Sequence, residues 1–265
     1  MFTEVKASQS FKMTIGGLMS IFLLALVIFA IGYLINIFYI TVLYHRGLSH
    51  GSVVMGPKLT KFLQYTGIWV TGIDPKAWAC MHRMHHMHSD TELDPHSPKV
   101  FGVFGVAMEQ LHSYENVLRQ LIKKNPKFTR LVSDIPFDVS ALNYKKMWML
   151  PYVLHLVLAV AIGFATGSVI LGFAYYAGIM SHPVQGWMVN ALAHRYGYRN
   201  FATKDESTNN WLVSFLVFGE GYQNNHHARP KRTNFAIRSS EFDFGYGLCL
   251  ISQKLGLLRL PKGSV

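Results

Sequence analysis

The stretch Met81–Asp90 reads MHRMHHMHSD, and four of its ten residues are histidines. His82, His85 and His86 stand at positions i, i+3 and i+4, a spacing that places side chains on one face of an α-helix. Neutral imidazole is a ligand for Fe, Zn, Cu and Ni, so three imidazoles on one face form part of a metal shell. The stretch therefore predicts a metal site on a helix. A solvated polar helix is the weaker interpretation, because histidines recur beside the apolar segments of this chain.

Two long segments, Met13–Tyr44 and Met147–Asn190, contain no Asp, Glu, Lys or Arg. The chain is 50% hydrophobic and 15% charged, whereas a typical soluble domain is roughly 25% charged. A helix needs about 20 apolar residues to cross a bilayer. The composition therefore predicts an all-α integral membrane protein. We expect a single domain over residues 1–265, with transmembrane helices at about 14–44, 147–165 and 168–190.

The first apolar segment is longer than one membrane crossing requires and shorter than two crossings with a turn. We expect one long, tilted helix that extends beyond the membrane at its C-terminal end. A short hairpin that turns near Gly16–Gly17 or near Gly32 is the alternative, and the sequence leaves it open.

The formal net charge of +11 is concentrated in residues 45–146 and 191–265. Basic residues beside membrane spans favour the cytoplasmic side, so both regions are expected to form a cytoplasmic helical cap. This bias explains the charge without nucleic acid as a partner. A multi-pass protein with its catalytic face in the cytoplasm suits a bacterial inner membrane. Four basic residues are candidates for binding a phosphate-bearing substrate headgroup or lipid: Lys76, Arg195, Arg199 and Arg229.

Further histidines follow the predicted spans. His45 and His50 come after the first span, where five residues on an ideal helix separate side chains by about 140°. They can still converge if the helix ends or bends at Gly47. His194 follows the last span, and the pair His226–His227 lies in the C-terminal region. Because two crossings return the chain to the side that it left, these histidines can meet the His82 helix.

Other histidines are expected to have structural roles. His155 and His182 fall within predicted spans, where we assign them hydrogen-bonding or packing roles. His182 stands about 18 Å before His194 along a continuous helix, too far to share a metal without a break in that helix. His88 lies off the face of His82, and His96 lies in a proline-containing loop.

Four segments, in order, resemble the membrane fatty acid desaturases of the acyl-CoA and acyl-lipid delta-9 type. They are HRGLSH at 45–50, HRMHH at 82–86, NALAHRYG at 190–197 and GEGYQNNHH at 219–227, and DPHSP at 94–98 is also similar. The resemblance spans about 45–261 and implies a non-haem di-iron centre on the cytoplasmic face. Asn190 matches a position that helps to hold a metal-bound water. The implied iron ligands are His45, His50, His82, His85, His86, His194, His226 and His227.

The last segment departs from the family pattern at one position. The family usually has a histidine where this chain has Gln223. An amide oxygen is a weaker neutral donor than imidazole. Either Gln223 is a ligand, or a water takes its place, or one iron is held more loosely.

The resemblance implies O2-dependent insertion of a cis double bond into a CoA-linked or lipid-linked fatty acyl chain. An unactivated methylene has no acidic proton, so this oxidation needs a metal centre, O2 and two electrons. We expect the electrons to come from a separate donor, such as ferredoxin or cytochrome b5, with its reductase. The acyl chain should occupy an apolar tunnel, for which composition offers four candidate wall residues: Trp69, Trp78, Trp148 and Trp187.

Two other functions compete with a desaturase. A fatty acyl or alkyl hydroxylase on the same scaffold would share the hydrogen abstraction and yield an alcohol. A membrane metal-binding or transport protein would distribute its ionisable residues through the depth of its spans. The histidines instead gather on one side of the predicted spans, which argues against transport.

Overall fold

One helix organises the fold of the computed structural model, which describes residues 15–263. α1 (Ile15–Ile37) continues directly into a π-helix, η1 (Phe38–Ser49). Within the described residues, Gly17–Ser49 is the one helical stretch that is long and apolar enough to cross a membrane. The expectation of one long helix is therefore confirmed, and the alternative hairpin is wrong, because Gly32 lies within α1.

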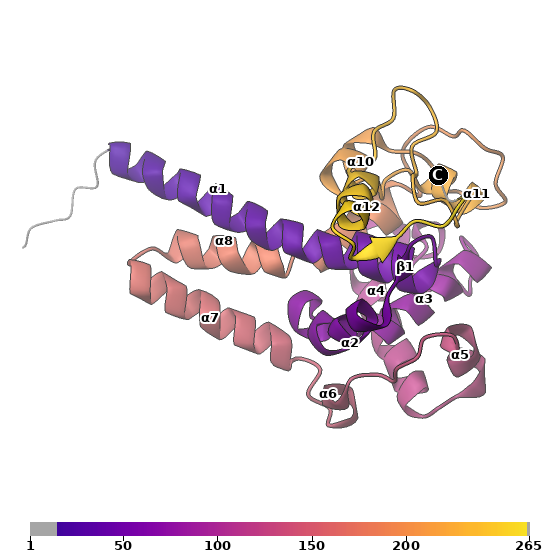
Figure 1. The fold of residues 1–265 in the computed structure, drawn as a ribbon, viewed down its shortest axis with the longest axis horizontal. Coiled ribbons are helices and arrows are strands. Elements are labelled where there is room, and N and C mark those ends of the chain that lie inside the picture. The colour runs from indigo at the N-terminus through magenta and orange to yellow at the C-terminus, as the bar shows by residue number, and fades with distance from the viewer. Residues whose placement is uncertain (1–14, 264–265) are drawn as a thin grey trace, which may run out of the picture.

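The second apolar segment forms a helical hairpin beside α1. α7 (Leu150–Thr166) and α8 (Val169–Ile179) are shorter than α1, and all three project from one side of the molecule (Figure 1). Gly178 allows α8 to approach α1 closely, because a Cβ atom there would lie 2.5 Å from the carbonyl oxygen of Phe29. Small residues commonly permit such contact between apolar helices.

The expected helix over 168–190 is divided. α8 ends at Ile179, α9 (His182–Trp187) begins after Met180 and Ser181, and the π-helix η3 (Met188–Leu192) follows. Pro183 has no N–H with which to continue the helical hydrogen bonds. The carbonyl of Ile179 instead accepts a 2.8 Å hydrogen bond from Nδ2 of Asn36 on α1. Pro183 therefore explains the break, and Asn36 satisfies the carbonyl group that the break leaves free.

The cap contains three longer helices, α2 (Pro57–Thr71), α3 (Pro75–His88) and α4 (Pro98–Ile122). Each begins with proline, which suits the first turn of a helix. The Asp74 side chain caps α3 by accepting hydrogen bonds from the N–H groups of Lys76 and Ala77. α4 bends at Gly102, whose φ of 70° is left-handed.

Short elements complete the cap around these helices. The strands β1 (Val54–Met55) and β2 (Leu258–Arg259) pair antiparallel and bring the C-terminal segment back beside η1. The main apolar core joins η1, α3 and α4, with Leu43, Trp78 and Val117 among its buried residues. The remaining helices are α5 (Pro126–Thr129), η2 (Arg130–Val132), α6 (Ala141–Tyr144), α10 (Trp211–Leu216), α11 (Gln223–Ala228) and α12 (Phe244–Lys254).

Candidate metal centre

The π-helix η1 brings His45 and His50 together. The backbone N–H of His50 donates to the carbonyl oxygen of His45 at 3.2 Å, an i+5 bond of the π-helical type. The two imidazole rings are 5.0 Å apart, centre to centre. η1 continues through Gly47, so its wider winding, and not an end or bend of the helix at Gly47, brings the two rings together.

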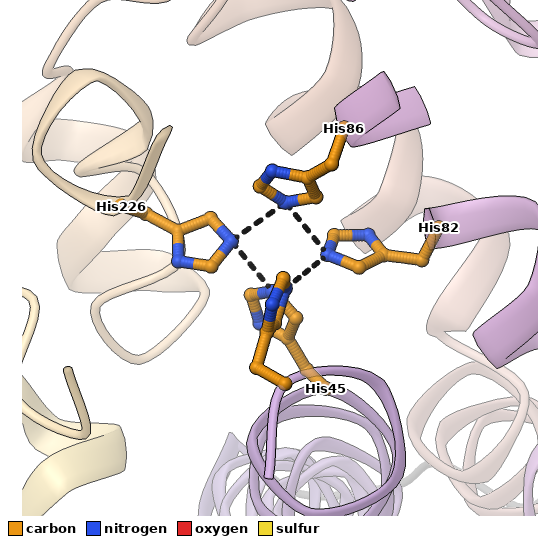
Figure 2. Close-up of side chains that lie close together, drawn as sticks. His45, His82, His86 and His226 are labelled. Carbon is orange, nitrogen blue, oxygen red and sulfur yellow. Dashed lines mark hydrogen bonds between the residues drawn. The ribbon is translucent and has the colours of Figure 1, made fainter. Parts of the chain in front are cut away.

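Five histidines from three parts of the chain form one group. Ligand atoms of His45, His50, His82, His86 and His226 lie within 4.8 Å of one another. The Nε2 atoms make the contacts, at 2.8 Å between His50 and His82 and 2.9 Å between His226 and His86. Figure 2 shows four of these rings pointing toward a common centre. Five converging nitrogens on neutral rings offer several lone pairs to a cation.

Three other histidines form a second group. Ligand atoms of His85, His194 and His227 lie within 4.8 Å of one another. The Nε2 atom of each is buried and has no hydrogen-bond partner among the described residues. Buried polar atoms are normally paired. These three unpaired nitrogens therefore fit a metal ion as their common partner.

Carboxylates hold the opposite nitrogen of each ring in the second group. His85 Nδ1 lies 2.9 Å from Asp94, and His194 Nδ1 lies 3.2 Å from Asp90. His227 Nδ1 lies 2.9 Å from Asp205. An imidazole that donates its Nδ1–H to a carboxylate presents the Nε2 lone pair to a metal, which is the usual arrangement behind metal-binding histidines.

The first group has a comparable anchor on one ring. Nδ1 of His45 lies 2.6 Å from Glu220, which also accepts a hydrogen bond from Arg46 at 2.8 Å. Arg46 is fully buried, pairs with Asp243 at 2.9 Å and stacks on Phe235. Burial alone would lower the pKa of Arg46, but Asp243 and Glu220 raise it. The anchor is thus a buried network of paired charges.

Sequence reasoning missed all four of these carboxylates: Asp90, Asp94, Asp205 and Glu220. Asp94 and Glu220 belong to segments quoted for the family resemblance, so their place in those segments could have indicated that they lie at the site. Asp90 and Asp205 reach the second histidine group from loops, and nothing in their local sequence indicates that contact.

The electrostatic environment keeps most of these rings neutral. Burial lowers the pKa of His82, His86 and His226 well below the ordinary value, and neighbouring imidazoles add to the effect. Burial also lowers the pKa of His227 to about 4, against the opposing effect of Asp205. His194 differs, because Asp90 raises its pKa despite burial. Neutral imidazole is the form that binds metal.

A cavity of about 310 Å³ reaches the five-histidine group, and His45 and His82 lie in its lining. Its walls are mainly apolar, and Trp78 and Trp148 are among them. Two of the four tryptophans expected to line a tunnel are therefore in place. Trp69 is absent from the lining residues described, and Trp187 instead donates through Nε1 to the carbonyl of Val103.

Asn190 and Gln223 also line this cavity, next to Glu220. Gln223 is buried, and its Nε2 donates to the carbonyl oxygen of Glu220 at 2.7 Å. The structure thus places Asn190 and Gln223 beside the candidate centre, with the amide nitrogen of Gln223 bonded to the backbone.

The histidines outside the two groups make the hydrogen bonds and packing contacts expected of them, and His96 also belongs to a third potential ligand group. His155 contacts the Tyr175 hydroxyl at 2.6 Å and the carbonyl of Trp69 at 2.7 Å. His182 accepts a 3.2 Å hydrogen bond from the indole of Trp78. His96 is buried 4.6 Å from the ring of His85, and burial lowers its pKa to about 3. With His85 and Asp94 it makes a third potential ligand group.

The four candidate headgroup residues lie away from the cavity lining described above. Lys76 donates to the carbonyl of Phe137 at 2.6 Å, which occupies its ammonium group. Arg199 donates to the carbonyls of Thr203 and Asp205. Arg195 is exposed. Arg229 lines a separate surface hollow with Lys231 and Arg232.

Comparison with known proteins identifies similar chains. The fatty acid desaturase family model matches residues 20–239. An acyl-CoA 5-desaturase, AL21, of Anemone leveillei is 31% identical over 90% of this chain and 70% of its own length. An sn-1 stearoyl-lipid 9-desaturase of Anabaena variabilis is 32% identical over 82% of this chain and 76% of its own. Delta-9 acyl-lipid desaturase 2 of Arabidopsis thaliana is 29% identical, with coverages of 82% and 68%.

Proposed function

The chain belongs to the fatty acid desaturase family and is a fatty acyl desaturase, and we propose that it inserts a cis double bond at a di-iron centre held by its two histidine groups. One observation carries the assignment of the centre. Three buried Nε2 atoms, on His85, His194 and His227, have no partner among residues 15–263, while carboxylates hold their Nδ1 atoms. Nitrogen donors of this kind suit iron.

The proposed ligands are the eight histidines of the two groups. Five would hold one iron and three would hold the other. Asn190 is proposed to orient a metal-bound water from the cavity wall. We place Gln223 outside the ligand set, because the two histidine groups supply ligands for both irons without it. The ligands are His45, His50, His82, His86 and His226 for the first iron, and His85, His194 and His227 for the second.

Bound iron, with O2 and two electrons, supplies the hydrogen abstraction that side-chain acid–base chemistry cannot perform on a methylene group. The protein contributes position and exclusion of water. Trp78 stacks on the ring of His82 at 5.1 Å and also forms the cavity wall, so an acyl chain against Trp78 lies beside the five-histidine group. Apolar walls keep bulk water from the reacting carbons.

The family is membrane-associated, and we propose a multi-pass arrangement with the cap in the cytoplasm. α1 supplies one crossing, and the hairpin of α7 and α8 supplies the others. Phe164 and Val169 at the tip of this hairpin are more than four-fifths exposed, as side chains facing lipid would be. Because α8 is short, α9 and η3 would complete its passage to the cap. The basic loops favour a cytoplasmic cap.

Electrons for the reaction are proposed to come from a separate small redox protein, such as ferredoxin or cytochrome b5, with its reductase. The substrate is a fatty acyl group, as the names of the relatives indicate for those proteins.

Lipid analysis after expression in a host that lacks its own desaturase tests this function. We expect a new cis-monounsaturated acyl chain with the wild type and none with His85→Ala. If the product is an alcohol and not an alkene, the chain is a hydroxylase and not a desaturase. If the wild type gives no product in a host supplied with ferredoxin and its reductase, or with cytochrome b5 and its reductase, the proposal fails.

A further inference from the structure

α4 presents apolar side chains to its surroundings. Phe104, Met108 and Leu111 stand at positions i, i+4 and i+7 and therefore share one helical face. They are 84%, 58% and 41% exposed, respectively. Single exposed apolar residues are ordinary, but a contiguous apolar face marks a surface that contacts a protein, a membrane or a ligand.

This face of α4 borders the cavity that reaches the five-histidine group, called the acyl cavity below. Met108 and Leu111 line the cavity and are also exposed at the outer surface, and His112 lines it beside them. His45 and His82 line the same cavity. The cavity therefore connects the apolar face of α4 with the five-histidine group.

The charged residues of the cavity lining do not suit coenzyme A. Its phosphates would need arginine or lysine, the side chains that bind phosphate groups. Over residues 15–263, the cavity lining includes no arginine or lysine, whereas Glu115 belongs to it. Glu109 adds a second carboxylate, 3.8 Å from His112. Arg119, which follows on α4, is exposed and lies outside the lining.

The other side of α4 is fixed to the end of the apolar helices. The indole of Trp187 donates to the carbonyl of Val103 at 2.8 Å, and Gln110 donates to the carbonyl of Pro183 at 2.9 Å. Trp187 and Pro183 belong to α9, which follows α8 after two residues. α4 thus lies where the apolar helices meet the cap, the level expected for a bilayer surface. An amphipathic helix at that level buries its apolar face among lipids.

We propose that the substrate is the acyl chain of a membrane lipid, which enters the cavity from the bilayer past Phe104, Met108 and Leu111. This inference rests on the desaturase function proposed above. A lipid keeps its headgroup at the hydrated membrane surface, so the cavity needs no lysine or arginine to neutralise a headgroup phosphate. An acyl-CoA would have to hold its phosphates beside Glu109 and Glu115.

Photo-crosslinking tests the lipid route without turnover. The full chain is reconstituted in vesicles of phosphatidylethanolamine and phosphatidylglycerol that contain stearoyl-phosphatidylglycerol with a diazirine in its acyl chain. Cleavage at Lys99 and Arg119 releases Val100–Arg119, which carries the whole apolar face. We expect label in this peptide and none in the preceding peptide, Met84–Lys99, where Leu93 is an exposed apolar control. Absence of label from Val100–Arg119 overturns the proposal.

Turnover then identifies the carrier. Membranes that contain the protein and its electron donor receive deuterated stearoyl-phosphatidylglycerol or deuterated stearoyl-CoA. We expect the deuterated monoene in the lipid first, and a several-fold loss with Phe104→Glu but not with Leu93→Glu. A monoene that forms first in the CoA pool overturns the proposal. If neither carrier yields a monoene, the desaturase function fails, and the crosslinking result still decides the lipid route.

Discussion

The backbone N–H of His50 donates to the carbonyl oxygen of His45, and this i+5 bond aligns two imidazoles that an α-helix would separate. The prediction concerns the spacing itself. Ser49→His combined with His50→Ser keeps two histidines but moves the second from i+5 to i+4. The side chain at position 49 is directed to the backbone, where the Ser49 hydroxyl donates to the carbonyl oxygen of Tyr44 at 3.0 Å. Iron affinity should therefore fall as far as in His50→Ser alone.

Metal content and chelator competition measure this effect. The single variant His50→Ser is the matched control, because it removes the imidazole without placing another nearby. Wild-type affinity in the double variant would contradict the role of the π-helix.

The carboxylates behind the second histidine group should control its affinity. We would replace each carboxylate by an amide, in Asp94→Asn, Asp90→Asn and Asp205→Asn. Each change weakens the hydrogen bond that one histidine donates from Nδ1, and loss of such a partner typically costs 10–100-fold in metal affinity. Chelator competition measures that loss. Asp134→Asn is a suitable control, because Asp134 pairs with Arg83 and is largely exposed. Unchanged metal affinity in all three variants would show that the carboxylates do not support metal binding.

Substitution of Gln223 shows whether iron has ligands other than the eight histidines. Both histidine groups form without Gln223, so Gln223→Leu should retain the wild-type iron content per chain. The Leu variant can still reduce activity, because the side chain lines the acyl cavity. Elemental analysis of the purified protein provides the test, with Gln223→His as the variant that restores the usual residue of the family. Loss of about one iron in the Leu variant would make Gln223 a ligand.

Acid should destabilise the metal-free protein. Burial lowers the pKa of His82, His86 and His226, so below about pH 6.5 the unfolded chain binds protons that the folded chain does not. Stability is therefore present above that pH and is lost as the pH falls. His194 acts in the opposite sense, because Asp90 raises its pKa, but the lowered groups outnumber it.

Thermal unfolding of the chelator-treated protein at pH 7.5 and pH 5.5 measures this dependence. We expect a lower Tm at pH 5.5 and a smaller difference in His226→Asn, which lacks one of the buried imidazoles. An equal or higher Tm at pH 5.5 would contradict the assignment of neutral, buried rings.

The sequence was sufficient to predict which histidines would gather. The i, i+3, i+4 spacing of His82, His85 and His86 holds in α3, and His194 and His226 lie in the histidine groups as expected. The single long first helix also follows from its length. These features depend on periodicity and composition, which are local properties of the chain.

Other features depended on tertiary contacts and were beyond such reasoning. The π-helical winding at His45 is one example. The end of α8 is another, because Asn36 on α1 accommodates the carbonyl of Ile179 there. The division into five and three histidines also arises only in three dimensions: His85 faces Asp94, one turn from His82, which faces His50.

The central claim is that two separate histidine groups each hold one iron. Iron content per chain, measured after purification with iron and without chelators, tests it most directly. We predict two irons per chain in the wild type and one in His194→Ala, which removes a ligand from the three-histidine group alone. One iron in the wild type, or no iron in His194→Ala, would contradict two independent sites.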